Sequence, residues 1–127
     1  MIDTTPVKPI GVAAVLMADI DGYSRLMSLN EEKTSRRVAE AIELMQQLIK
    51  DYGGEIKNIA GDGVLALFDN VTDSIDFAVA MQEEFIKDTV WASQDEPIAF
   101  RIGITVGEVR EGNFGLHGHA INVASRI

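Results

Sequence analysis

The chain of 127 residues has no cysteine, only three prolines and only two histidines. Without cysteine it can form no disulfide, bind no metal through thiolates and use no cysteine nucleophile, and nothing indicates an oxidising compartment. A cytoplasmic location is therefore expected. The low proline content, with 46% hydrophobic and 24% charged residues, is typical of an ordinary globular protein rather than a disordered or fibrous one.

Positive charge and long apolar runs are also scarce. Eleven Lys and Arg residues stand against 20 Asp and Glu, which gives a formal net charge of -9. Such a chain repels nucleic-acid backbones and anionic membranes at long range, so neither is expected as a partner. The longest apolar run, Gly11 to Ala18, is far shorter than the roughly 20 residues that span a bilayer. The length predicts a single domain, 1–127, with one hydrophobic core.

The first half of the chain predicts one strand and one long helix after a loose segment over residues 1–10. The apolar residues Val12–Met17 suit a short buried strand. Apolar residues recur at helical spacing over Glu31–Asp51, with Asn30 as the N-cap and Gly53 just beyond the end.

The second half predicts a hairpin, a helix and a further strand. Glu55–Ile59 and Val64–Phe68 are the expected hairpin strands. A helix is expected from near Thr72 to before Pro97, with one apolar stripe formed by Ile75, Ala78, Met81 and Phe85. Ile98–Val106 resumes strand character, and Ala120–Ile127 could begin a third helix. This order predicts an α+β sandwich of the ferredoxin-like βαββαβ type, an antiparallel sheet with its helices on one face.

Two aspartates beside predicted turns are candidate metal ligands. Asp19 follows the first strand, and Gly22 shortly after it would let backbone amides approach an anion closely. Asp62 lies at the hairpin tip, between two glycines. If the carboxylates converge at one sheet edge, they would suit Mg²⁺ or Mn²⁺. For a strand-end Asp-x-Asp taken alone, aspartates that merely cap the following helix are favoured over metal ligands. For Asp62, spacing alone leaves a plain hairpin turn and a metal ligand equally open.

Polar residues near the C-terminal end form two further candidate sets. Asn122 and Arg126 are four residues apart, so on a helix they would present an amide and a fixed cation on one face. Taken alone, such a pair is more often a surface arginine beside a local cap. His117 and His119 are expected in the loop before Asn122, where solvated histidines are favoured over a metal-binding pair.

Three motifs in order resemble the class III adenylyl and guanylyl cyclase catalytic domain. They are Ala-Asp-Ile-Asp-Gly-Tyr-Ser-Arg-Leu-Met at 18–27, Ala-Gly-Asp-Gly-Val-Leu-Ala at 60–66 and Asn-Val-Ala-Ser-Arg at 122–126. The similarity runs from about Val12 to Ile127 and includes residues 101–104 and 107–109, which resemble the family's central strand and the turn after it.

The resemblance implies roles for specific residues. Asp19 and Asp62, with the backbone carbonyl of Ile20, would bind Mg²⁺ or Mn²⁺, two ions per site. The triphosphate and the sugar would be held by the remaining motif residues: Gly22, Tyr23 and Ser24 at the triphosphate, Asn122 at the ribose and Arg126 at the transition state. The implied reaction is attack of the ribose 3′-hydroxyl on the α-phosphate of ATP, or less favourably GTP, which gives a 3′,5′-cyclic nucleotide and pyrophosphate. Such sites are completed across a head-to-tail homodimer.

The positions that resemble the family's base-reading residues depart from its pattern. Asn58 stands where members often carry a lysine, and Lys57 is one place earlier, where the alternation of a regular strand would point it to the other face. Gly115, at the other base-selecting position, has no side chain to read a purine. The choice between adenine and guanine therefore stays open.

Family domains continue beyond the position of Arg126 with further strands and a phosphate-binding lysine, so the C-terminal segment is expected to be missing and turnover by this chain to be weak. A cyclase-homology domain that serves dimerisation or nucleotide sensing is the main alternative. Diguanylate cyclase is a lesser one, because the Gly-Gly-Glu-Ile at 53–56 ends a helix instead of joining two strands. The presence of Asp19, Asp62, Asn122 and Arg126 together favours an active phosphorus-oxygen lyase.

Overall fold

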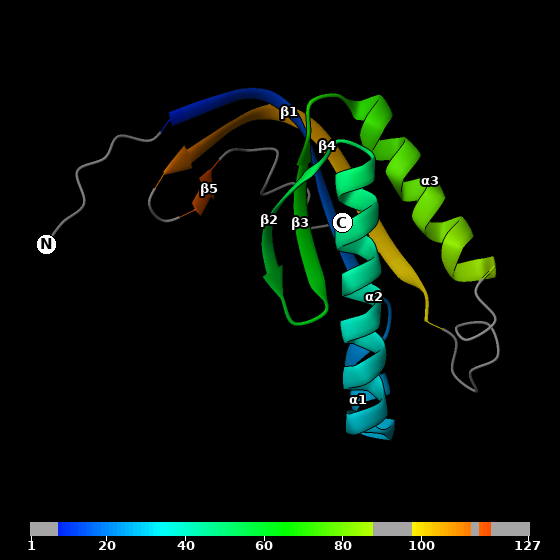
Figure 1. The fold of residues 1–127 in the computed structure, drawn as a ribbon. Helices are drawn as coiled ribbons and strands as arrows, with labels where there is room; N and C mark the ends of the chain where they lie inside the picture. The colour runs from blue at the N-terminus through cyan, green and yellow to red at the C-terminus, as the bar shows by residue number, and fades with distance from the viewer. Residues whose placement is uncertain (1–7, 88–97, 113–114, 118–127) are drawn as a thin grey trace, which may run out of the picture.

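The computed structural model describes residues 8–87, 98–112 and 115–117, which form one five-stranded antiparallel sheet with three helices (Figure 1). The strands lie in the order β2-β3-β1-β4-β5, with β1 at the centre. Their bounds are β1 Lys8–Ile20, β2 Glu55–Ala60, β3 Gly63–Phe68, β4 Phe100–Gly112 and β5 Gly115–His117. The helices are α1 Tyr23–Leu29, α2 Glu31–Asp51 and α3 Val71–Lys87. The predicted βαββαβ core is confirmed, with α1 and β5 as additions.

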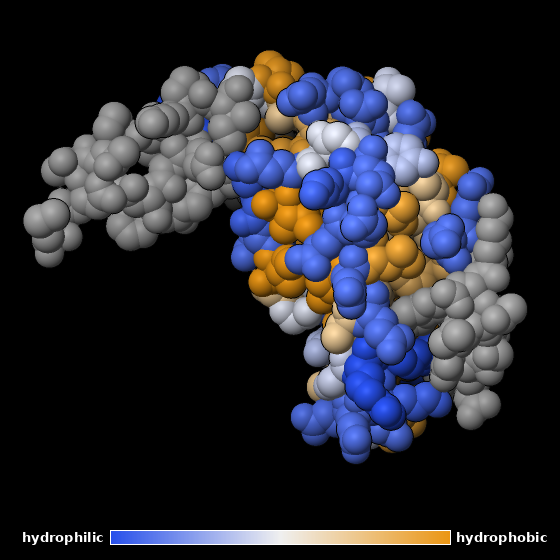
Figure 2. Space-filling model, viewed as in Figure 1, coloured by the Kyte–Doolittle hydropathy of each residue, from blue (hydrophilic) through white to orange (hydrophobic). Residues whose placement is uncertain are grey.

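Helix α2 begins and ends where the sequence predicts. The side chain of Asn30 accepts a hydrogen bond from the Lys33 N–H at 2.9 Å, which caps the first turn. At the other end Gly53 adopts a φ of 80°, and the N–H groups of Gly53 and Gly54 donate to the carbonyls of Lys50 and Ile49. This is the Schellman arrangement, which satisfies carbonyls that the helix itself leaves unpaired. The outer face of α2 is hydrophilic (Figure 2).

The apolar stripe predicted for helix α3 is confirmed at Met81 and Phe85 but wrong at Ile75. Ile75 was expected in the buried stripe, but it is 48% exposed. The inward face carries Ser74, Phe77, Met81 and Phe85. Ile75 is two positions from Phe77 and so lies on roughly the opposite side of the helix. The large side chains at four-residue spacing decide the orientation, because they bury more apolar area than Ile75 could.

The central strand β1 is buried on both of its faces. Ala14, Leu16, Ala18 and Ile20 pack in the cluster beneath the helices. Ala13 and Val15 pack with Leu67 and Val109 in a second cluster on the opposite face. This two-sided burial explains why Ala13–Ala18 is uniformly apolar instead of alternating. Val12, the first residue of the predicted strand, is 70% exposed.

The sheet is more extensive than the sequence pattern predicts. β1 begins at Lys8, so residues 8–10 of the segment expected to be loose are strand, and β4 continues from Phe100 to Gly112 instead of ending at Val106. β5 was not predicted; it contains Gly115 and also His117, which was expected in a loop and pairs with Arg110. Glycines obscure the strand pattern here, whereas the backbone hydrogen bonds come from pairing of β1 with β4 and of β4 with β5. In Figure 1 this end of β1 and β4 extends with β5 beyond the helices.

None of the described helices is long and apolar enough to cross a membrane.

Candidate functional site

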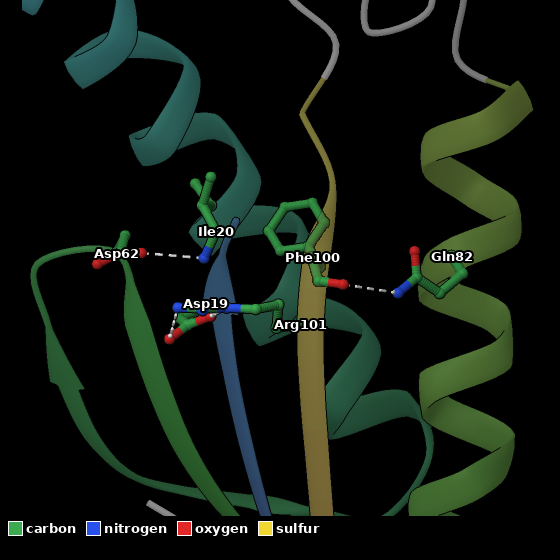
Figure 3. Close-up of polar contacts among 6 residues, drawn as sticks. All are labelled: Asp19, Ile20, Asp62, Gln82, Phe100 and Arg101. Carbon is green, nitrogen blue, oxygen red and sulfur yellow. Dashed lines mark hydrogen bonds and ion pairs between the residues drawn. The ribbon is translucent and has the colours of Figure 1, made fainter. Parts of the chain in front are cut away.

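The structure brings the two predicted aspartates to one edge of the sheet (Figure 3). β3 pairs with β1 as far as Val64 opposite Ala18, so the turn before β3 lies beside the last residues of β1. Asp19 is the next residue of β1, and Asp62 lies in that turn. The backbone N–H of Ile20 donates a hydrogen bond to Oδ2 of Asp62 at 2.9 Å. This bond fixes the β2–β3 turn against the end of β1.

The turn that carries Asp62 depends on its preceding glycine. Ala60 pairs with Gly63, so Gly61 and Asp62 form a two-residue connection between β2 and β3. Gly61 has a φ of 59°, in the left-handed region that glycine adopts without steric cost. A tight connection with a glycine at its first position is a known way to join two antiparallel strands.

Arg101 of β4 is a functional candidate that sequence reasoning missed. It lies directly opposite Asp19 in the β1–β4 register. Its Nε donates to Oδ1 of Asp19 at 2.8 Å, and a terminal guanidinium nitrogen donates to Oδ2 at 3.0 Å. The hydrogen bond to Asp19 and the charge of that carboxylate raise the pKa of Arg101 above its ordinary value, with smaller contributions from Asp21 and Asp62. Only the strand register reveals this pair, because the residues are far apart in the sequence.

The beginning of β4 is anchored on both sides. The N–H of Asp21 donates to the carbonyl of Ala99 at 2.8 Å. From the helix layer, the side-chain amide of Gln82 donates to the carbonyl of Phe100 at 3.3 Å. The rings of Phe85 and Phe100 also pack, with their centroids 4.5 Å apart. These contacts fix the backbone next to Arg101.

The predicted phosphate-binding segment is a turn that leads into a short helix. Gly22 has a φ of 70° and is the N-cap of α1, without a side-chain capping hydrogen bond. The alternative in which a nearby aspartate caps this helix is therefore wrong. Tyr23 packs partly against the main core, whereas Ser24 is exposed. Helix α1 itself was not predicted, because its seven residues are too few to display a clear periodicity.

The donor set suits a divalent cation that is shared with a substrate. Among the described residues, no group of three or more His, Cys, Asp or Glu side chains is arranged to hold a metal ion. The edge offers two carboxylates, Asp19 and Asp62, and the backbone of Ile20. Mg²⁺ commonly binds through one or two carboxylates together with substrate phosphates instead of a complete protein cage. The residues therefore fit a nucleotide-bound metal better than a structural one.

A β-bulge changes where the candidate base-reading residue points. Glu55 pairs with Leu67 and Asn58 with Leu65, so Lys57 is an extra residue without a partner position on β3. Leu65 and Leu67 belong to the cluster on the face away from the helices. Lys57 Nζ forms an ion pair with Glu55 at 2.9 Å. Lys57 and Asn58 therefore share that face, and the expectation that strand alternation separates them is wrong.

The other predicted site residues are only partly described. Gly115 lies in β5 opposite Gly112, at the end of the sheet that extends beyond the helices. Asn122, Arg126 and His119 lie outside the described residues, as does the predicted third helix over 120–127. Their roles remain predictions.

Comparison with known proteins places the chain in a family. Residues 5–127 match the adenylate and guanylate cyclase catalytic domain. A putative adenylate cyclase from Rhizobium meliloti is 32% identical over 117 residues, which cover 91% of this chain and 20% of that protein. A solved adenylate/guanylate cyclase/hydrolase from Silicibacter pomeroyi is 34% identical with a TM-score of 0.81, covering 95% of this chain and 70% of that one.

The adenylyl cyclase CyaB from P. aeruginosa shares the fold, with a TM-score of 0.82 at 24% identity over 96% of this chain and 72% of that one. The chain spans less than half of the length of the curated relatives that it matches. The ordered motifs, the antiparallel sheet with its paired aspartates and the match over residues 5–127 together lead to one assignment. The chain belongs to the adenylate and guanylate cyclase catalytic domain family.

Proposed function

We propose that this domain converts ATP, and less readily GTP, into the 3′,5′-cyclic nucleotide and pyrophosphate. The observation that carries the proposal is the hydrogen bond from Ile20 N–H to Asp62, because it joins the Asp62 turn to the strand end that bears Asp19. The preference for ATP is supported by the Rhizobium relative, whose name is that of an adenylate cyclase. The lack of cysteine supports a cytoplasmic location.

Asp19 and Asp62, with the backbone carbonyl of Ile20, would hold two Mg²⁺ or Mn²⁺ ions. When bound, the ions would activate the ribose 3′-hydroxyl and neutralise charge that develops on the α-phosphate. The hydrogen bond from Ile20 uses one oxygen of Asp62 and thereby fixes the direction of the other. Gly22, Tyr23 and Ser24 would lie at the triphosphate, where the left-handed Gly22 lets the backbone turn closely.

The sugar and the transition state would be contacted by Asn122 and Arg126. In the proposed head-to-tail homodimer these two residues come from the partner of the chain that supplies the aspartates. Asn58 and Gly115 are the proposed base-facing positions. Because neither offers a charged side chain, discrimination between adenine and guanine is expected to be modest.

The test is to incubate the protein, extended to the full length of the solved domains, with ATP or GTP and Mn²⁺ and to identify the products by mass spectrometry. Cyclic AMP should form from ATP, and a chelator should abolish the reaction. Binding of nucleotide without a cyclic product would favour the alternative of a dimerisation or nucleotide-sensing module. It would contradict the proposed catalysis.

A further inference from the structure

The side chain of Asp19 is already held by a cation from its own chain. Arg101 binds it through both carboxylate oxygens, at 2.8 Å and 3.0 Å. This bidentate pairing is the strongest geometry available to arginine and a carboxylate, because two charge-assisted hydrogen bonds form in parallel. Any ion that approaches Asp19 therefore meets a carboxylate whose two oxygens both already accept hydrogen bonds.

An ion pair this exposed is ordinarily weak, because solvent screens it and two long side chains lose rotamer freedom. The side chain of Arg101 is 58% exposed and that of Asp19 is 42% exposed. The backbone, however, is fixed on both sides. Asp19 and Arg101 are directly opposed on β1 and β4, and Gln82 holds the carbonyl of the residue before Arg101. The pair therefore forms at a lower entropic cost than an unconstrained surface pair.

The surroundings favour a cation at this position. The charges of Asp19, Asp21 and Asp62 all act on the guanidinium of Arg101 in the stabilising direction. A divalent cation bound at Asp19 would face the same carboxylates and would lie beside the guanidinium. The metal ion and the guanidinium of Arg101 would be adjacent positive charges and would repel each other. The metal and the bidentate ion pair therefore cannot both be fully accommodated.

We propose that Arg101 is a built-in competitor of the divalent metal for Asp19, and that it sets the metal concentration at which this edge of the sheet is loaded. The inference rests on the metal role proposed above for Asp19 and Asp62. Such a competitor lowers the apparent affinity for the metal in proportion to the fraction of molecules in which the Asp19 oxygens are available. Displacing the guanidinium is thus part of the free energy of metal binding.

The experiment measures Mn²⁺ binding to the purified chain without nucleotide, by electron paramagnetic resonance of free Mn²⁺. Arg101→Gln should bind Mn²⁺ roughly three- to tenfold more tightly than the wild type. Gln82→Ala keeps both members of the pair but removes an anchor, so it should tighten binding by a smaller factor. Circular dichroism and thermal melting establish that each variant is folded.

Arg110→Gln is the matched control. It removes the same charge from the far end of the same strand, where Arg110 pairs with Glu108 at 3.5 Å. That position is about 30 Å away by the rise of a strand, well beyond a Debye length of roughly 8 Å. Mn²⁺ affinity should therefore change by less than about twofold. An equal gain in both variants would indicate a general charge effect and would overturn the proposal.

Asp62→Asn separates failure of this inference from failure of the proposed metal site. If Asp62→Asn weakens Mn²⁺ binding but Arg101→Gln does not tighten it, the metal site stands and the competition is refuted. If Asp62→Asn binds Mn²⁺ as the wild type does, Asp62 is not a ligand and both proposals fall.

Discussion

At the scale of single residues, the candidate site depends on where one turn places one carboxylate. Asp62 lies in the turn before β3, and its position follows from the hydrogen bond to Ile20 and from the backbone of Gly61. At this turn Asp62 supplies the carboxylate, and Gly61 supplies the backbone conformation that places it. Substitutions at the two positions therefore test the two roles separately.

Asp62→Ala should reduce cyclic nucleotide formation by at least about 100-fold, because a charge-stabilising group at the transition state would be lost. The measurement is the initial rate at saturating Mn²⁺ and ATP. Asp69→Ala is the control: that exposed aspartate directly follows β3, at the opposite end of the same hairpin from Asp62. If Asp62→Ala retained the activity of Asp69→Ala, the two-metal proposal would be wrong.

Gly61→Ala should destabilise the fold by about 1–2 kcal/mol, because an L-residue is strained at a φ of 59°. Beyond its two chain neighbours, no described heavy atom lies within 4 Å of the added Cβ, so the backbone alone accounts for the cost. Chemical denaturation gives the free energy of unfolding. Gly61→Asn should lose less, because asparagine tolerates the left-handed region. Equal losses in the two variants would argue against backbone strain as the cause.

Single residues also mark where sequence reasoning reached its limit. Asp19 and Asp62 were found because strand ends and turn glycines are visible locally. Arg101 was not, because its partner Asp19 is identified only by the register between β1 and β4. Asn58 was found, but the expectation that Lys57 points to the opposite face from it was wrong, because the bulge at Lys57 leaves no clear signal in the sequence. Long-range pairing and bulges are tertiary properties.

At the scale of elements, the junction of α2 with β2 is the tightest contact that the structure describes around a glycine. A Cβ on Gly54 would lie 2.6 Å from ring atoms of Phe68 and 2.9 Å from the Cγ2 of Ile49. The end of α2 thus approaches β3 so closely that no side chain fits between them. This contact sets how the helix lies on the sheet.

Gly54→Ala should cost about 1–3 kcal/mol in unfolding free energy, as is typical of overpacking in a dense core. Urea denaturation of the single variants and of the double variant with Phe68→Leu tests the mechanism. The smaller side chain should relieve the clash, so the combined loss should be less than the sum of the two single losses. Strict additivity would show that the Phe68 ring is not what excludes a larger residue.

The elements were predicted well where a local signal was strong. Helix α2 has caps at both ends and three regular apolar turns, so both of its bounds were correct. The short α1 and β5 were missed, since each has too few residues to establish a period. The orientation of α3 was wrong at Ile75, because several rotations of that helix would bury apolar residues. The observed rotation of α3 is the one that buries Phe77 against the sheet.

At the scale of the whole molecule, the proposed active sites require two chains. Asp62→Ala and Arg126→Ala should each be inactive alone, yet a heterodimer of the two would contain one intact site. An equal mixture that exchanges subunits freely should recover about a quarter of the wild-type rate. The measurement is activity against mixing ratio, with each variant alone as its control. No recovery despite demonstrated subunit exchange would exclude a site shared between chains.

The strand order has a consequence for how the site opens. Asp19 belongs to β1, which is bonded on both sides, whereas Asp62 lies in the turn between β2 and β3, and β2 is the outermost described strand on that side of the sheet. Edge elements open locally far more readily than central ones. The turn that carries Asp62 is therefore expected to unfold locally more often than the end of β1 that carries Asp19. A metal ion bound by both aspartates would add a second link between the β2–β3 turn and the end of β1, beside the hydrogen bond from Ile20 to Asp62. Loading of the site would then slow amide exchange in β2 while leaving that of β1 nearly unchanged.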